Sequence, residues 1–303
     1  MERLEAALQW LGLEHGRVAS YKKLLAEYYE GQRSNEHFFA FYQAMDALSI
    51  FDTWKDTAGD FPGLQDKISV IFKKGPLLPQ GENASANSNR PRNDGFVYIL
   101  GGKFLHGQGI TIISVDGIPN KRADDAEVGA NPPSDILLLF RDTLIRVECK
   151  RPMNSNTLAA NIETASSQIA TSRQEKSYGV IAVDVSKLIE QPGQYLEASS
   201  LDAGSNYLTD RVADILTPLA KQYCQEWLLG LIGFASIPLV ATARSVVLQQ
   251  DGRPYEIKDL RTAAVSWVTI KNKKCPKSEL LRELQLSYMR IAHSVPSNSV
   301  PMT

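Results

Sequence analysis

Apolar residues recur with helical spacing over about the first 60 residues and form short runs of strand length in the middle of the chain. The helical stripes begin at Leu4, Tyr21 and Phe38 and repeat every three or four residues, which predicts three helices. The apolar runs lie at residues 110–115, 136–140, 144–147 and 178–185. This order predicts a helical segment over residues 1–75 and a second domain over residues 76–303.

The two runs at 136–140 and 144–147 are separated by Arg141-Asp142-Thr143, which predicts a β-hairpin. After it, Leu158, Ile162, Ala165 and Ile169 share one helical stripe, and residues 154–156 supply N-cap candidates. The run at 178–185 is rich in β-branched residues and predicts a buried central strand.

The rest of the chain is patterned less sharply. Residues 80–93, 116–133 and 191–205 are polar and rich in turn formers, and they predict loops. A long helix is expected over 207–229, and the run 227–243 is expected to hold a helix end followed by a strand. Two strands are expected at 239–248 and 263–270, joined by a turn at 251–254. An amphipathic helix over 277–291 and a disordered tail should follow. The uncharged run 227–243 is short for a bilayer span, so no membrane partner is expected.

The hairpin carries charged side chains at the ends of its otherwise apolar strands. Asp135 precedes the first strand, and Glu148 and Lys150 end the second. Residues two apart on a strand point to one face, so Glu148 and Lys150 share a face while Cys149 points to the other. Such charges are costly unless they are paired or bind a cation. Two carboxylates with an open coordination sphere suit Mg²⁺ or Mn²⁺.

Asp135, after Pro132-Pro133-Ser134, and Glu148-Cys149-Lys150 resemble the signature of the PD-(D/E)XK nuclease superfamily. The helix and strand that follow resemble its core too, and the resemblance covers residues 87–190. It implies an α/β, restriction-endonuclease-like mixed sheet flanked by helices, here with an added N-terminal helical segment and a C-terminal helix and strand elaboration. It also implies a Mg²⁺-dependent deoxyribonuclease.

The resemblance assigns roles to individual residues. Asp135 and Glu148 would hold the metal with the backbone carbonyl of Cys149, and Lys150 would orient or deprotonate the attacking water. Arg151 would hold a neighbouring phosphate, Arg92 would add a further substrate contact, and Gln168 on the following helix would face the centre. For Gln168, a solvated helix position is the alternative.

The resemblance also implies a helix upstream of Asp135, for which residues 93–105 are the candidate, and an acidic residue on that helix often completes the metal site in this superfamily. Where such a Glu would follow Phe96, this chain has Val97. Asp94 is the nearest replacement, although it would also suit a helix N-cap. Glu82 and Glu127 are further possibilities, and the site can also consist of two acids alone.

Composition describes an ordinary globular chain of 303 residues with a formal net charge of −1, so bulk charge does not favour nucleic acid. Local basic pairs such as Lys150-Arg151 can bind phosphates regardless. Three separated cysteines and four unpaired histidines give no zinc signature. The cysteine usage and the absence of a secretory signal pattern lead us to expect a cytoplasmic protein.

The expected partner is DNA, with bacterial defence or restriction as the context. Because the chain has no GxxxxGK[ST] loop, a separate helicase or ATPase is a possible partner, as is a second copy of the chain. Two alternatives stay open. One is a catalytically weak nuclease fold that binds DNA or regulates a partner, and the other is a simple surface ion pair between Glu148 and Lys150.

Overall fold

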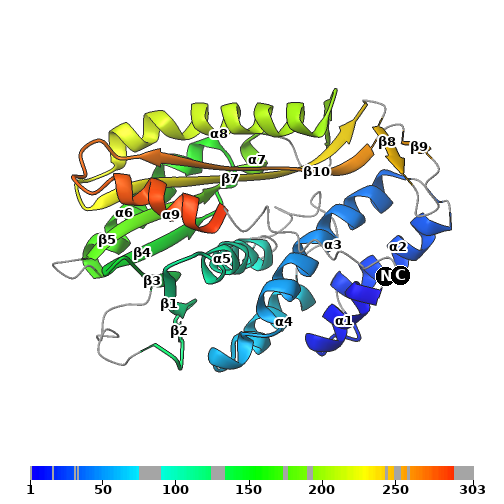
Figure 1. The fold of residues 1–303 in the computed structure, drawn as a ribbon, viewed down its shortest axis with the longest axis horizontal. Coiled ribbons are helices and arrows are strands. Elements are labelled where there is room, and N and C mark those ends of the chain that lie inside the picture. The colour runs from blue at the N-terminus through cyan, green and yellow to red at the C-terminus, as the bar shows by residue number, and fades with distance from the viewer. Residues whose placement is uncertain are drawn as a thin grey trace, which may run out of the picture.

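A computed structural model of the chain describes residues 2–15, 17–30, 32, 34–74, 90–123, 134–172, 177–189, 194–242, 245–248, 254–257 and 260–289. They form an open central sheet with helices on both faces (Figure 1). The sheet is mixed, because β3 and β4 are antiparallel whereas β4 and β5 are parallel. The α/β class predicted from the sequence is therefore confirmed.

The main sheet has the strand order β10-β7-β5-β4-β3-β1-β2, with β6 beside the end of β7. Its strands are β1 (Ile110–Val115), β2 (Ile118–Pro119), β3 (Ile136–Phe140), β4 (Thr143–Lys150), β5 (Ser177–Asp184), β6 (Leu196–Ala198), β7 (Leu228–Ala241) and β10 (Leu260–Lys271). A separate ladder joins β8 (Ser245–Leu248) to β9 (Pro254–Ile257). The central strands β5 and β7 are buried along nearly their whole length because helices cover both of their faces.

Two hydrophobic cores lie on the two faces of this sheet. One contains Ile145 and Val147 of β4 together with α5 (Arg90–Leu105) and α9 (Glu279–Met289). The other contains Ile181 and Val183 of β5 together with α6 (Ser155–Ser172) and α8 (Leu201–Tyr223). Figure 1 shows α8 along one face and α3 and α5 on the other. The charged end of β4 therefore lies between two helical layers.

The amino-terminal helices are α1 (Glu2–Trp10), α2 (Arg17–Tyr29), α3 (Asn35–Trp54) and α4 (Leu64–Lys73), with a short 3-10 turn at Ala58–Asp60. Their apolar residues belong to the same core as α5 and β4. The indole nitrogen of Trp54 donates to the carbonyl of Tyr98 at 3.0 Å. The helical segment thus shares its hydrophobic core with the sheet.

Local sequence explains the predicted hairpin and the helix after it. Arg141 and Asp142 take φ of +48° and +58°, as a two-residue hairpin turn of the primed type requires. Asn154 precedes α6, and its side-chain oxygen accepts from the backbone N–H of Thr157 at 3.1 Å, an N-cap contact. Both elements are confirmed, and β4 is longer than the apolar run alone suggested.

Several predicted boundaries were wrong. Helix α5 begins at Arg90, so the last four residues of the expected loop 80–93 are helical, and the earlier ones lie outside the described residues. Helix α8 begins at Leu201, where a loop was expected, because Ser200 caps it by accepting from the backbone N–H of Ala203. It ends at Tyr223, well before Leu229. The expected tail also lies outside the described residues.

The uncharged run 227–243 is mostly the 14-residue strand β7, and the helix end expected there is wrong. Pro238 does not break it, because the pairing of β7 with β5 ends at Phe234 and its pairing with β6 begins at Leu239. The strand expected at 239–248 is in fact divided between β7 and β8. Across the described ranges, no helix has both the length and the apolarity to cross a bilayer.

Gly230 gives a test of this sheet. It has a φ of +149°, and a Cβ there would lie 2.1 Å from the carbonyl oxygen of Ile270. We expect Gly230→Ala to lower the free energy of unfolding by about 3 kcal/mol or more, because both backbone strain and a clash with β10 would follow. Gly59→Ala, with nothing within 4 Å of the added carbon, is the control. Urea unfolding of both variants measures this, and equal stabilities would contradict the β7 geometry.

Candidate functional site

Asp135 and Glu148 come together where β3 begins and β4 nears its end. Ile136 pairs with Val147 in the antiparallel register, so the next pair outward is Asp135 and Glu148. Residues opposite each other across antiparallel strands project to the same face of the sheet. The Asp135 carboxylate also accepts from the backbone N–H of Cys149 at 2.7 Å. Two acids separated by twelve intervening residues therefore share one site.

Lys150 lies on the same face as Glu148, as the alternation of side chains predicted. Its Nζ is 3.2 Å from Glu148 Oε2 and 2.8 Å from Gln168 Oε1 on α6. Gln168 thus reaches this site through Lys150. The Glu148 side chain is only 7% exposed whereas that of Lys150 is 19% exposed, so solvent reaches this site from the Lys150 side.

Burial makes the two carboxylates hard to ionise together. It is the main cause that raises the pKa of Glu148 to about 7, and the nearby Asp135 charge adds to it. Burial likewise raises the pKa of Asp135 above its ordinary value, and the charge of Asp116 contributes. Lys150 opposes both shifts without cancelling them. A proton or another cation beside Glu148 would relieve the repulsion between the two carboxylates.

Cys149 differs from its neighbours in both direction and chemistry. Its side chain packs against the core that contains Ile145 and Val147. Burial and the charges of Asp135 and Glu148 raise the pKa of its thiol well above the ordinary value, so the sulfur stays neutral. Any metal contact made by Cys149 would therefore come from its backbone carbonyl.

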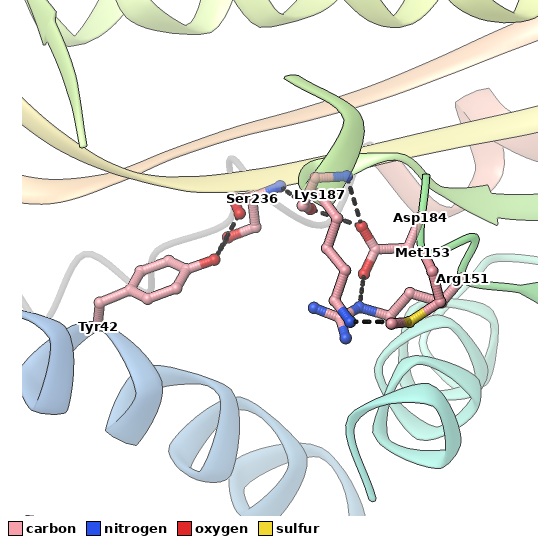
Figure 2. Close-up of polar contacts among 7 residues, drawn as sticks. Tyr42, Arg151, Met153, Asp184, Lys187 and Ser236 are labelled. Carbon is pink, nitrogen blue, oxygen red and sulfur yellow. Dashed lines mark hydrogen bonds and ion pairs between the residues drawn. The ribbon is translucent and has the colours of Figure 1, made fainter. Parts of the chain in front are cut away.

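Arg151 is held in a buried ion pair, with its Nε 2.8 Å from Asp184 Oδ2. The other Asp184 oxygen accepts from the backbone N–H of Ser186 at 2.9 Å and from its hydroxyl at 2.5 Å. Ser186 Oγ in turn accepts from the backbone N–H of Ser236. Figure 2 shows Tyr42 of α3 reaching Ser236, where its hydroxyl donates to the carbonyl oxygen at 2.5 Å. A polar chain therefore joins α3 to the residue after Lys150.

The candidates for a third acid fare differently. Val97 is buried in α5, and Asp94 is the fifth residue of that helix, so Asp94 does not act as its N-cap. Glu82 and Glu127 lie outside the described residues, and the side chain of Arg92 does so as well. In the described ranges, no group of three or more His, Cys, Asp or Glu is arranged to hold a metal ion.

Two charged residues near this site were missed from the sequence. Asp116 follows β1, and its charge acts on Asp135. The Asp116-Gly117 pair is a strong hairpin-turn signal that would have marked it. Arg146 is 3% exposed on the same face of β4 as Glu148, and its Nε has no hydrogen-bond partner. The sequence did contain a signal for Arg146, because it is a charged residue within an apolar strand, two residues before Glu148 and therefore on the same face.

Comparison of the chain with family models, with curated proteins and with solved structures found no match to any of them.

The strained acidic pair predicts how stability depends on pH. An acid with a pKa of about 7 when folded and near 4.5 when unfolded binds more protons in the folded state between these values. The free energy of unfolding therefore falls as pH rises through this window. We expect Glu148→Gln to be more stable than the wild type at pH 8 by about 1–3 kcal/mol, and the gain to shrink by pH 5.

Urea unfolding in chelator at pH 5 and pH 8 measures this difference. Glu163→Gln, on the exposed side of α6, is the matched control and should show no such gain. A Glu148→Gln protein that is less stable than the wild type at pH 8 would contradict the buried, charge-crowded site.

The Arg151 pair predicts a second stability effect. Arg151→Met leaves Asp184 buried without its cation, so we expect a loss of about 3–5 kcal/mol in the free energy of unfolding. The double variant Arg151→Met/Asp184→Asn removes both charges and keeps an acceptor for Ser186, so it should recover part of that loss. Chemical denaturation of both proteins checks this. An Arg151 that served only to bind phosphate would leave stability unchanged.

Proposed function

We propose that this protein is a divalent-metal-dependent nuclease that hydrolyses phosphodiester bonds in DNA. The observation that carries the proposal is the meeting of Asp135 and Glu148 across β3 and β4, with Lys150 beside them. The order of α5, β1, β3, β4, α6 and β5 supports it, because the PD-(D/E)XK core also runs helix, three strands, helix, strand; the two-residue β2 lies between β1 and β3 in addition. We therefore propose a restriction-endonuclease-like core.

The residues of the site fit Mg²⁺ or Mn²⁺. Asp135 and Glu148 are neighbouring carboxylates whose pKa values are raised mainly by burial, so a bound cation would stabilise their charged forms. Mg²⁺ is usually held by one or two carboxylates together with waters and substrate phosphates, so two acids suffice. The carbonyl of Cys149 would be a further oxygen ligand. When bound, such a cation would lower the pKa of water and stabilise charge on the phosphate oxygens.

The chain's own residues would orient the reactants. The Nζ of Lys150 donates to both Glu148 and Gln168, so the lysine ammonium is held in one position at the site before substrate binds. It would hold or deprotonate the attacking water, or neutralise charge that develops on the phosphate. Gln168 would orient Lys150. Arg151 is committed to Asp184, so we assign it a structural role and propose no phosphate contact for it.

We propose a cytoplasmic bacterial defence or restriction effector that acts with a helicase or ATPase or as a homo-oligomer. Buried Val97, where the resemblance places an acid, favours a second candidate. In that candidate the chain is a catalytically weak nuclease-fold subunit that binds DNA or regulates a partner ATPase.

The test incubates the purified protein with linear, circular and single-stranded DNA and with RNA, in Mg²⁺, in Mn²⁺ and in chelator. We expect cleavage of DNA only with metal. Asp135→Asn, Glu148→Gln and Lys150→Met should each lower the rate by about 10²-fold or more, because each removes a metal ligand or the positioned cation. The matched controls are Glu163→Gln and Lys103→Met, both exposed.

Circular dichroism and thermal melting confirm that each variant folds. Wild-type rates in folded Glu148→Gln and Lys150→Met proteins would overturn the nuclease assignment. Calorimetric Mn²⁺ binding by the wild type, lost in Glu148→Gln and without cleavage of any substrate, would instead support the second candidate.

A further inference from the structure

Asp116 occupies a two-residue turn directly beside Asp135. Val115 pairs with Ile118, and the intervening Asp116 and Gly117 take φ of +50° and +73°. Positive φ at a non-glycine residue is unfavourable unless neighbouring contacts maintain it, although Asp tolerates it better than most residues. The backbone N–H of Asp116 donates to the carbonyl of Asp135 at 2.7 Å. The conformation of this turn therefore sets the position of the Asp135 backbone.

Two helices hold the turn through its aspartate. The Tyr98 hydroxyl on α5 donates to Asp116 Oδ2 at 2.8 Å. Lys67 on α4 donates from one Nζ to the same oxygen at 2.9 Å and to the Asp116 carbonyl at 2.7 Å. Burial and the Asp116 charge raise the pKa of Tyr98 far above its usual value, so Tyr98 remains a donor. The Asp116 side chain and backbone are thus fixed from the same side.

A short series of contacts leads from α4 to the candidate metal site. Lys67 holds Asp116, Asp116 holds the Asp135 backbone, and the Asp135 carboxylate accepts from the N–H of Cys149. The Lys67 and Asp116 side chains are 48% and 42% exposed. An ion pair this exposed contributes under about 1 kcal/mol to stability, so stability alone does not account for the arrangement.

We infer that Asp116 is a positioning residue, locked by Lys67 and Tyr98, which fixes Asp135 in the geometry that the reaction needs. This inference rests on the proposed nuclease function. It makes the amino-terminal helices part of the catalytic machinery, because α4 supplies the lysine. Asp116 acts here through the backbone of Asp135, since Asp116, Asp135 and Glu148 do not form a three-acid metal group.

Variants at position 116 separate geometry from charge. Asp116→Gly permits the positive φ but removes the contacts to Tyr98 and Lys67. Asp116→Asn removes the negative charge while its carbonyl still accepts from both, and Asn also tolerates this backbone region. Lys67→Met removes the lock from α4, and Lys73→Met, an exposed lysine on the same helix, is its control.

We expect Asp116→Gly and Lys67→Met to lower kcat for Mg²⁺-dependent DNA cleavage by about 10–10²-fold with KM nearly unchanged, because misplacement affects the reacting geometry more than DNA binding. Residue-resolved amide exchange by NMR should show faster exchange at Cys149 in both variants. Asp116→Asn and Lys73→Met should resemble the wild type in both measurements.

Unchanged Cys149 exchange in Asp116→Gly would overturn the inference. So would an Asp116→Asn protein as impaired as Asp116→Gly, because charge rather than position would then be the cause. If the wild type cleaves no nucleic acid, the proposed function fails, and the exchange measurement still decides whether Asp116 positions Asp135.

Discussion

The proximity of two carboxylates, Glu148 buried and Asp135 half-buried, is the constraint on which the rest of the site depends. Asp135 and Glu148 meet because the register of β3 and β4 places them opposite each other, and burial raises the pKa of both. Such crowding is unfavourable for a folded chain unless a cation compensates it. The ammonium of Lys150, which contacts both Glu148 and Gln168, compensates only part of the negative charge of the two carboxylates. A protein that keeps this arrangement gains nothing in stability from it, which is why a functional role is the better explanation.

The surrounding architecture keeps this charged end of the sheet rigid. The strands β4 and β5 run in parallel between two hydrophobic cores, so their backbones are fixed on both faces. Contacts from the amino-terminal helices reach the site from two directions. Lys67 fixes the turn at Asp116, and Tyr42 begins the buried polar chain that ends at Arg151, next to Lys150. We infer that the helical segment and the sheet, which share a hydrophobic core, together hold the proposed site in place.

The spacing of apolar residues and the turn and cap residues correctly predicted those elements that depend on a short stretch of sequence. The hairpin and strand β5 follow from short apolar runs and a polar turn, and helix α6 follows from helical spacing and an N-cap at Asn154; all three were confirmed. Predictions failed where a helix cap or a neighbouring strand decides. The expected loop 191–205 includes the start of α8, which Ser200 caps. The helix end expected in 227–243 is part of strand β7, in which Pro238 lies where one neighbouring strand is missing.

The sequence by itself determined that Glu148 and Lys150 share a face, because side chains alternate along any strand. It also placed Asp135 at the start of the partner strand. Only the tertiary structure decided that Arg151 pairs with Asp184, that Gln168 reaches Lys150, and that Asp116 holds the Asp135 backbone. These contacts join residues on different elements, and their distances depend on how the helices and strands pack. A periodic pattern reports which way a side chain points, whereas its partner is set by the fold.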